Sequence, residues 1–312
     1  MKSRDSSIPV VLFAFGANFI IAVVKFAVFL LTRSSAILAE TVHSVADTMN
    51  QVLLLVGIRN GRREPDQLHP FGFSGELYFW SFIVAMLLFT AGSIYSIWQG
   101  IHKWMNPHPV QQIHYAFAIL GVAIIVEGAA FLKARRMVHK ERRGMSVYRY
   151  LRCSKKSELI VVFMEDLAAL TGLCIAALCL TLEQLTGLLV FDALASILIG
   201  LLLAGVAVFL ANETKSLLVG EAADPEVIQG VKSILGDDDS VNHVIHMRTL
   251  HLGPEDILLA AKLEFNDRLN AREISNLING FERDIRKNYP QIRRIFIEPD
   301  ILRSGYCAHW DK

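Results

Sequence analysis

A histidine and an aspartate lie inside an otherwise apolar stretch of this 312-residue chain, where their side chains could bind one metal ion. His43 and Asp47 are four residues apart, so on an α-helix they share one face, one turn apart. An imidazole and a carboxylate at that spacing can hold two corners of a tetrahedral zinc site. A polar contact between helices is the alternative, and it is the more common explanation in a soluble helix. In a membrane helix an ionisable residue indicates function, so we interpret the pair as half of a metal site.

A second pair of acids, Glu165 and Asp166, lies in a later apolar segment. Adjacent residues on a helix point about 100° apart. We therefore expect one acid to meet His43 and Asp47, while the other pairs with a different helix or faces a water-filled cavity. Two carboxylates and a histidine suit zinc, and also manganese, iron(II) or cobalt, but not copper(I), which prefers thiolates.

Other polar residues of the apolar segments are weaker candidates. Glu40 could approach the same helix face as the histidine, or pair near the membrane interface. Glu127 lies deep in its segment, where a cationic partner, a role in proton transfer and a hydrogen bond between helices are all open interpretations. We interpret Asp192 as a residue beside a helix N-terminus, and Asn50 and Gln51 as bridges between helices.

Two of the histidine-bearing regions outside the apolar segments are further candidates for a metal site. Asp66 and His69 could bind a cytoplasmic metal ion, although a structured turn is the interpretation that we favour. His243, His246 and His251 lie near an expected strand. Residues at odd positions share one strand face, which places His243 and His251 together and opposite His246. Surface histidines are common, so we favour an ordinary surface role for these three over a metal site.

Long apolar runs dominate the first two thirds of the chain. Hydrophobic residues make up 53% of the sequence and its mean hydropathy is +0.40, which is high for a soluble protein. A bilayer core about 30 Å thick needs about 20 apolar helical residues to cross it. Six segments qualify: Ile8–Leu31, Ala36–Ile58, Leu77–Ile101, Ile113–Leu132, Leu159–Leu182 and Leu189–Leu210. In lipid each segment must close its own backbone hydrogen bonds, so we predict an all-α membrane domain of six helices over residues 1–212.

Basic residues are concentrated in alternate loops, most densely between Lys133 and Lys156. The positive-inside rule then places both termini in the cytoplasm. The first apolar segment is longer than the roughly 7–15 residues of a signal-peptide core, so we interpret it as a retained helix. No organellar presequence is visible, which favours a bacterial plasma membrane.

The remaining residues, 213–312, predict a cytoplasmic α+β domain. The expected elements, in the order α-β-β-α-β, are a helix after Asp224-Pro225, strands Val241–Leu250 and Ile257–Phe265, a helix after Asn270 and a strand Ile292–Ile297. Asn270 and Glu273 have the spacing of a capping box. The sequence thus predicts two domains, a membrane domain and a small α+β domain.

Several classes of function are disfavoured. The four cysteines form no CxxC pair, so neither a disulfide framework nor a zinc–thiolate site is expected. We interpret Cys174 and Cys179 as small buried packing residues. A membrane-embedded metalloenzyme would need an activated water and a base near the metal, and the sequence has no HExxH pair and no GxSxG elbow. A net charge of +1 gives no indication of a nucleic-acid partner.

Several segments also carry the signature of a known family. The segment Ser34-Ser-Ala-Ile-Leu-Ala-Glu-Thr-Val-His-Ser-Val-Ala-Asp47 is similar to the second-helix signature of the cation diffusion facilitators. His69-Pro-Phe-Gly-Phe-Ser-Gly-Glu76 resembles the segment before their third helix. Ala46-Asp-Thr-Met-Asn-Gln51 and Glu165-Asp-Leu-Ala-Ala-Leu-Thr-Gly172 resemble the zinc-transporter-nine-like branch. The resemblance extends over essentially the whole chain.

The resemblance implies a homodimer that exports zinc or related ions from the cytoplasm in exchange for protons. It implies a tetrahedral site between the second and fifth helices. Carried over by position, His43 and Asp47 supply the second-helix ligands, and Asp166 matches the fifth-helix acid. The remaining ligand position falls on Val162, which cannot bind metal, so Glu165 or a water is left to take that place.

Two further metal sites of the family are altered here. In the loop, Phe73 stands where a histidine is common, which leaves Asp66 and His69. In the tail, a histidine position of the family is occupied by Lys262. The tail acids Glu298 and Asp300 remain. We therefore expect the tail to be a dimerisation module rather than a strong zinc sensor.

The residues and the resemblance together predict a proton-coupled antiporter of divalent cations, with zinc as the first expectation and no resident cofactor. The reference pKa of an imidazole, about 6.5, lets a histidine hold a proton or a metal at cellular pH. The alternative is a non-transporting membrane sensor or scaffold, favoured by the missing ligand at Val162. The expected partners are the ion, protons, the lipid bilayer and a second copy of the chain, without nucleic acid.

Overall fold

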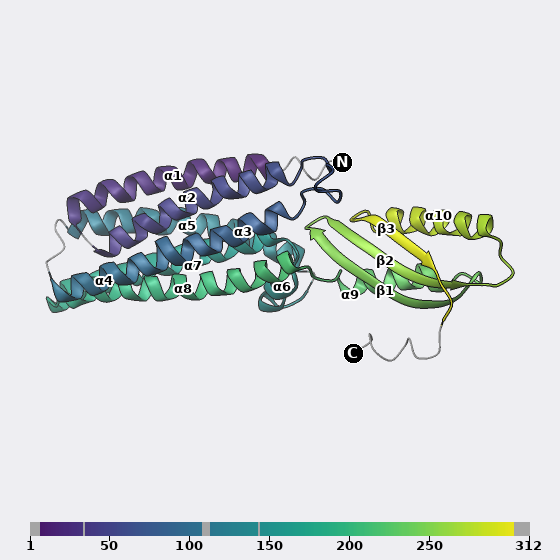
Figure 1. Ribbon diagram of the computed structural model, residues 1–312. Coiled ribbons are helices and arrows are strands. Elements are labelled where there is room, and N and C mark those ends of the chain that lie inside the picture. The colour runs from purple at the N-terminus through teal and green to yellow at the C-terminus, as the bar shows by residue number, and fades with distance from the viewer. Residues whose placement is uncertain (1–6, 34, 108–112, 143, 303–312) are drawn as a thin grey trace. The chain divides into compact units, whose positions relative to one another are not determined.

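The computed structural model describes residues 7–33, 35–107, 113–142 and 144–302, and it divides the chain into two compact units (Figure 1). The first unit contains the described residues up to Arg63 and those from Glu76 to Lys215. The second contains Glu64–Gly75 and the described residues from Ser216 onward. The long apolar helices and the β-sheet therefore lie in different units.

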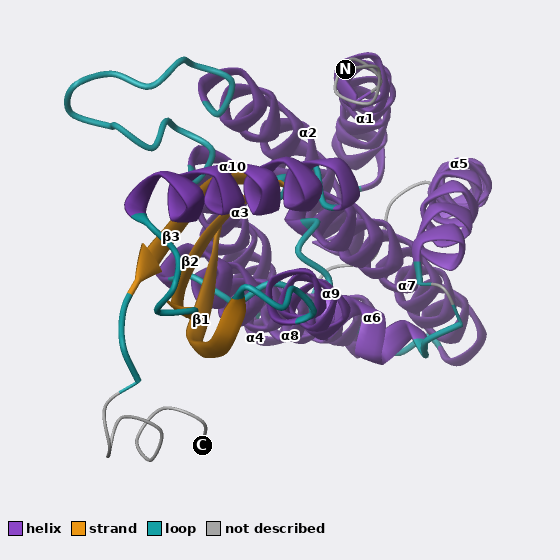
Figure 2. Ribbon diagram, turned by 90° about the vertical axis from the view of Figure 1, so that its right-hand side faces the viewer, coloured by secondary structure: helices purple, strands orange, loops and turns teal. Residues whose placement is uncertain are grey.

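The first unit is built of helices. In chain order they are α1 (Ser7–Thr32), α2 (Ser35–Asn60), α3 (Glu76–Leu87), α4 (Tyr95–Met105), α5 (Ile113–Glu141), α6 (Val147–Cys153), α7 (Ser157–Thr186) and α8 (Val190–Val219). A π-helical stretch, Leu88–Ile94, joins α3 to α4 in one continuous helix; π-helical turns are frequent at functional positions. Figure 2 shows α1 beside α2, and α5 beside α7.

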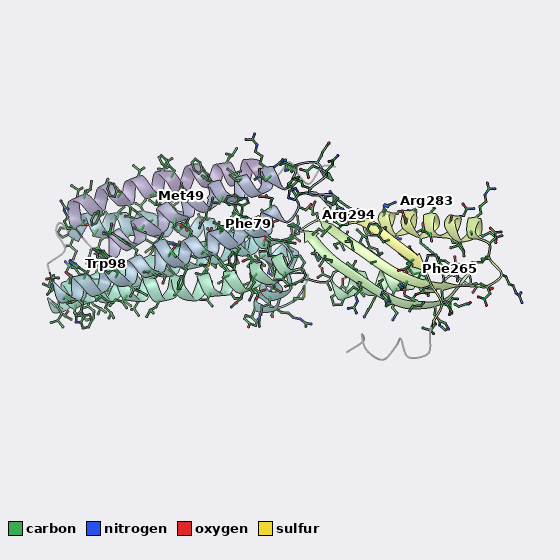
Figure 3. All side chains as sticks on the ribbon, in the orientation of Figure 1. Met49, Phe79, Trp98, Phe265, Arg283 and Arg294 are labelled. Atoms are coloured by element: carbon green, nitrogen blue, oxygen red, sulfur yellow. The ribbon has the colours of Figure 1, made fainter. Side chains whose placement is uncertain are left out.

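Four helices of the described residues are long and apolar enough to cross a membrane: Glu76–Met105, Ala116–Glu141, Ser157–Thr186 and Val190–Val219. α1 contributes a shorter apolar helix, Asn18–Thr32, and α2 does not meet this criterion. The length and composition of the described helices therefore support four spans and do not confirm the expected six. Large apolar side chains such as Met49, Phe79 and Trp98 are exposed on the helices (Figure 3), as a lipid-facing surface requires.

Two helices run further than the apolar segments that predicted them. α5 and α8 continue well beyond their expected ends, Leu132 and Leu210. The short helix α6 forms in the basic loop, where the Ser146 hydroxyl accepts a hydrogen bond from the backbone N–H of Arg149. Apolarity predicts only the lipid-facing part of a helix. Lysine, arginine and glutamate also favour helix, so the helices extend past the apolar limit.

The continuous helix Glu76–Met105 packs closely against α8 through two glycines. A Cβ atom at Gly100 would lie 2.8 Å from the carbonyl oxygen of Ala193. A Cβ atom at Gly200 would lie 2.9 Å from the carbonyl oxygen of Ser93. Both neighbours are backbone atoms, which can move only if a helix moves. Small residues at these positions therefore permit the close helix contact that is common in membrane proteins.

We expect Gly200→Ala to lower the stability of the helical unit by about 1–3 kcal/mol, the typical cost of overpacking. Gly205→Ala is the matched control on the same helix, because nothing lies within 4 Å of its added Cβ atom. The control is expected to be neutral or to gain up to about 1 kcal/mol from helix propensity. Thermal unfolding of both variants in detergent measures the difference, and equal melting temperatures would show that the helices are not constrained at this contact.

The second unit is an α+β fold in the expected order of elements. Its elements are α9 (Pro225–Gly236), β1 (Val241–Gly253), β2 (Asp256–Phe265), α10 (Ala271–Asn288) and β3 (Ile292–Pro299). The strand β2 is central, and it pairs antiparallel with β1 and parallel with β3. Alternate residues of β2, including Leu259, Ala261 and Leu263, are buried in one core with Leu235 of α9 and Ile285 of α10.

The starts of the two helices in this unit differ. The Asn270 side chain accepts a hydrogen bond from the backbone N–H of Glu273, whose carboxylate accepts one from the N–H of Asn270. This reciprocal pair confirms the predicted capping box. Asp224 precedes α9, with Pro225 in its first turn, as predicted, but the Asp224 side chain makes no capping hydrogen bond.

Residues 64–75 belong to the second unit, although they connect two helices of the first. Arg294 of β3, labelled in Figure 3, forms an ion pair with Asp256 of β2 and donates a hydrogen bond to the carbonyl oxygen of Phe71. The Ser74 hydroxyl donates to the second carboxylate oxygen of Asp256 at 2.7 Å. The expected division into residues 1–212 and 213–312 did not include this return of the chain, because it depends on a few polar contacts that hydropathy does not register.

Candidate metal site

The helix α2 carries the histidine–aspartate pair in a buried position. His43 is 0% exposed and Asp47 is 6% exposed. The Nδ1 atom of His43 lies 3.6 Å from Oδ1 of Asp47, which is too long for a hydrogen bond. The two side chains therefore lie side by side without satisfying each other.

Both residues have buried polar atoms that make no hydrogen bond within the described part of the chain. These atoms are the two ring nitrogens of His43 and Oδ1 of Asp47. A buried donor or acceptor without a partner costs about 1–3 kcal/mol, so such atoms are rare in proteins unless a ligand satisfies them. Imidazole nitrogen and carboxylate oxygen both bind zinc. The chemistry of these two side chains therefore fits a divalent cation.

The helix α7 brings acids toward α2. Glu165 is 3% exposed, and its Oε1 atom accepts a hydrogen bond from Nδ2 of Asn50 on α2. Asp166, the next residue, is half-buried. The Asp47 carboxylate lies within electrostatic reach of both acids. Of the two α7 acids, Glu165 is thus the one that the structure shows accepting a hydrogen bond from α2.

The structure does not gather these side chains into a complete ligand set. Among the residues that it describes, no group of three or more His, Cys, Asp and Glu side chains is placed to hold a metal ion. Val162, at the expected fourth corner, packs partly buried against the apolar core of the helices. The assignment of His43, Asp47, Asp166 and Glu165 to one site therefore stays a prediction.

A buried lysine of α1 lies beside the candidate site, and it is not among the residues predicted from the sequence. Lys25 is 2% exposed, and its Nζ atom donates a hydrogen bond to the Ser44 hydroxyl at 2.8 Å. The same Nζ atom lies 3.9 Å from Oε1 of Glu127 on α5, so a cationic partner accounts for that acid. Lys25 is also within electrostatic reach of His43 and Asp47. A charge in the middle of an apolar segment was the signal that could have revealed it.

For other residues in the helices, one interpretation is extended and one is corrected. Asp192 lies in the first turn of α8, as expected. Asp192 forms a buried ion pair with Lys103, at 3.4 Å between its Oδ2 atom and Nζ, so its role is not explained by the helix N-terminus alone. Cys179 is buried as expected, but Cys174 is exposed on α7, because it lies on the outward face of that helix. The side chain of Glu40 lies outside the described residues.

Asp66 and His69 form a local turn. One carboxylate oxygen of Asp66 accepts hydrogen bonds from the backbone N–H groups of Leu68 and His69, at 3.0 and 2.6 Å. The His69 ring nitrogen Nδ1 lies 3.2 Å from that same oxygen. The hydrogen bond from the His69 N–H lowers the pKa of Asp66. The carboxylate thus serves the turn, in agreement with the structured-turn interpretation.

In the tail, Lys262 takes the place of a cation between two acids. Its Nζ atom lies 2.8 Å from Asp300 Oδ2 and 3.0 Å from Glu298 Oε1. The hydrogen bonds to Asp300 and then to Glu298 raise the pKa of Lys262. The family's histidine position is therefore filled by a tethered positive charge, which neutralises the acids that would otherwise attract a metal ion.

We expect Lys262→Met to weaken the sheet around β2 and β3 at neutral pH, because it leaves the carboxylates of Glu298 and Asp300 close together without this cation. The pKa of Lys262 is higher in the folded state, so its stabilising effect is complete below the unfolded lysine pKa of about 10.4 and is lost as the pH rises through the folded value. Hydrogen exchange of the β2 amides in the whole protein measures the effect as faster exchange. Lys232→Met, on an exposed position of α9, is the control, and equal exchange in the two variants would contradict the expectation.

The tail histidines do not share the environment predicted from their odd numbering. The side chain of His243 is 60% exposed and lies 3.9 Å from Glu264, whereas His251 is buried. A register irregularity between Val244 and His246 lies between these two positions. Such an irregularity reverses the alternation of faces along a strand, and it could not be seen in the sequence pattern.

Known proteins resemble the chain over most of its length. The sequence model of the cation efflux transmembrane domain matches residues 11–219. The chain is 33% identical over 274 residues to the mitochondrial proton-coupled zinc antiporter SLC30A9 of Xenopus laevis, covering 87% of this chain and 48% of that protein. It is 34% identical over 258 residues to metal tolerance protein C4 of Arabidopsis thaliana, covering 82% and 56%. It is 24% identical over 307 residues to the manganese efflux system protein MneP of Bacillus subtilis, covering 95% and 96%.

These relatives limit what can be carried over. The chain spans about half the length of the Xenopus and Arabidopsis proteins. The zinc antiporter is described as mitochondrial, so the comparisons do not support the expected bacterial plasma membrane. The family match covers the helices that carry His43, Asp47 and the α7 acids. The chain therefore belongs to the cation efflux family of metal-cation transporters, the cation diffusion facilitators, in its SLC30A9-like branch.

Proposed function

We propose that this protein exchanges a divalent cation, zinc in the first place, for protons across a membrane. The observation that carries the proposal is the buried pair His43 and Asp47, in which both ring nitrogens of His43 and Oδ1 of Asp47 make no hydrogen bond among the described residues. The acids of α7 stand within electrostatic reach of that pair. The zinc antiporter among the relatives supports the choice of ion and of proton coupling.

Competition between metal and protons supplies the coupling. A cation binds only when the imidazole is neutral and the carboxylates are ionised. Protons that arrive at His43 and at the α7 acids, Glu165 or Asp166, therefore displace the ion. Rocking of the helices between inward- and outward-open states would expose the same residues to each side in turn. Each transport step then moves the cation one way and protons the other way.

The membrane arrangement forms part of the same proposal. α1 and α2 join the four apolar helices to make six spans, since a helix that carries a metal site is expected to be less apolar than its neighbours. The density of basic residues between Lys133 and Lys156 favours a cytoplasmic position for that loop and for both termini. The second unit joins two copies of the chain, and the metal leaves the cytoplasm.

A flux assay with purified protein in liposomes tests the proposal. We expect zinc to accumulate in liposomes whose lumen is more acidic than the outside, and accumulation to stop when an ionophore collapses the pH difference. Manganese, iron(II) and cobalt are assayed in the same preparation, with protein-free liposomes as the control. If zinc crosses at the rate of protein-free liposomes, whatever the pH difference, the transport proposal is wrong.

A non-transporting metal sensor or scaffold is the second candidate. The observation that favours it is that the described residues contain no group of three or more His, Cys, Asp and Glu side chains placed to hold a metal. Lys262 also neutralises the tail acids Glu298 and Asp300. This candidate predicts metal or partner binding to the purified protein without flux in the liposome assay.

A further inference from the structure

Asn50 lies on the same face of α2 as the two candidate ligands, one turn beyond Asp47. At about 100° of rotation per residue, His43, Asp47 and Asn50 fall within a narrow arc of the helix surface. Asn50 is 0% exposed. The sequence predicts that this residue bridges two helices, and the structure shows its hydrogen bond to one neighbouring helix.

The Asn50 amide is bonded at one end and unsatisfied at the other. Its Nδ2 atom donates a hydrogen bond to Glu165 of α7, which fixes the orientation of the amide plane. Its Oδ1 atom is buried and makes no hydrogen bond within the described ranges. A buried carbonyl oxygen without a donor is costly, and next to two carboxylates it is the kind of ligand that binds a cation.

We propose that Asn50, Asp47 and Glu165 together bind the transported cation, and that Asn50 Oδ1 supplies a ligand that Val162 cannot supply. This assignment rests on the proposed function and deepens it, because it places the ion one turn further along α2 than the His43–Asp47 pair alone. Asp47 is shared between the two positions. Glu165 is then both the hydrogen-bond acceptor that orients Asn50 and a ligand in its own right.

The ligand chemistry of this group determines which metals it accepts. Asn50, Asp47 and Glu165 offer only oxygen atoms, and carboxylate and carbonyl oxygens suit manganese, whereas imidazole suits zinc. With the single imidazole of His43 nearby, the site is expected to bind both metals and not to reject manganese. Asn50 thereby becomes a residue that sets the metal preference of the transporter.

A purely structural bridge makes a different prediction. A hydrogen bond from Asn50 to Glu165 would hold α2 against α7, and its loss would change stability and affect all metals equally. Two substitutions of Asn50 separate these roles. Leucine and histidine both remove the amide, but only histidine supplies another atom that can bind a metal.

The test measures equilibrium binding of zinc and of manganese to the whole detergent-solubilised protein. We expect Asn50→Leu to weaken the binding of both metals by about tenfold or more. Removing a residue that only hydrogen-bonds to a metal ligand already lowers metal affinity by about 10- to 100-fold. Asn50→His is expected to recover zinc binding but not manganese binding. Gln51→Leu is the matched control, because Gln51 is a buried amide on the next position of α2, and it should leave both affinities unchanged.

Two results would overturn the assignment. One is binding of both metals to Asn50→Leu with the affinity of the unmodified protein. The other is a loss of affinity in Asn50→His that equals the loss in Asn50→Leu, for zinc as well as for manganese. A purely structural bridge predicts that result. Thermal unfolding of each variant confirms that it is folded. Failure of the unmodified protein to move any metal in liposomes would instead reject the proposed function, and the binding result would still decide the role of Asn50.

Discussion

Asp47→Ala is expected to reduce zinc flux in liposomes to the level of protein-free liposomes. The Asp47 carboxylate is buried beside His43 and within electrostatic reach of both α7 acids. It is therefore common to every arrangement of ligands proposed here. Loss of a residue that only hydrogen-bonds to a metal ligand lowers metal affinity or activity by roughly 10- to 100-fold, and loss of the ligand itself should cost at least as much. Asp47→Ala also removes a charge that attracts the ion. Initial rates of zinc uptake with an acidic lumen measure the effect.

Thr48→Val is the matched control for that variant. Thr48 is the next residue of α2, also buried, and its hydroxyl donates to the Ser44 carbonyl of its own helix, so its loss should leave flux nearly unchanged. Asp166→Ala and Glu165→Ala, assayed together, show which acid of α7 carries the larger share. Transport by both Asp47→Ala and Asp166→Ala at the rate of the unmodified protein would mean that the site is wrongly assigned.

The second large effect is expected at the buried charge pair beside the site. Lys25→Met should destabilise the helical unit by about 3–5 kcal/mol, the typical cost of breaking a buried ion pair. The change leaves the Glu127 carboxylate, 3.9 Å away, without this cation, and it removes the hydrogen bond to Ser44. Because Asp47 interacts electrostatically with both Lys25 and Glu127, we also expect the affinity for zinc to change. Thermal unfolding in detergent and equilibrium zinc binding measure the two effects.

The double variant Lys25→Met/Glu127→Gln separates the charge pair from packing. Removing both charges leaves no uncompensated ion, so most of the lost stability should return. Glu127→Gln alone is expected to be less stable than the double variant. If the losses of the two single variants simply add in the double variant, Lys25 and Glu127 do not act as a pair.

The sequence predicts the histidine–aspartate pair because helical spacing and burial in an apolar segment are local properties. Residues four apart share a helix face whatever packs against it, and the structure places His43 and Asp47 accordingly. The order of elements in the second unit follows from alternation and capping for the same reason. Such features require no knowledge of which helices become neighbours.

Features that depend on distant neighbours could not be predicted in the same way. The contact of Lys25 with Glu127 joins α1 to α5, and the contact of Asn50 with Glu165 joins α2 to α7. The sequence shows each of these residues as a polar position in an apolar segment, but it does not indicate which residue of another helix each one contacts. Residues 64–75 likewise join the second unit through Arg294, a contact more than two hundred residues away in the chain.

The exchange of metal for protons is the central claim, and a zinc gradient without an initial pH difference tests it most directly. Liposomes that hold the protein and a trapped pH dye are exposed to external zinc, and zinc entry and lumenal pH are recorded together. Obligatory exchange predicts that zinc enters and the lumen becomes more alkaline as protons leave, with both signals absent in Asp47→Ala. Zinc entry with no change of lumenal pH, or no zinc entry at all, would contradict the claim.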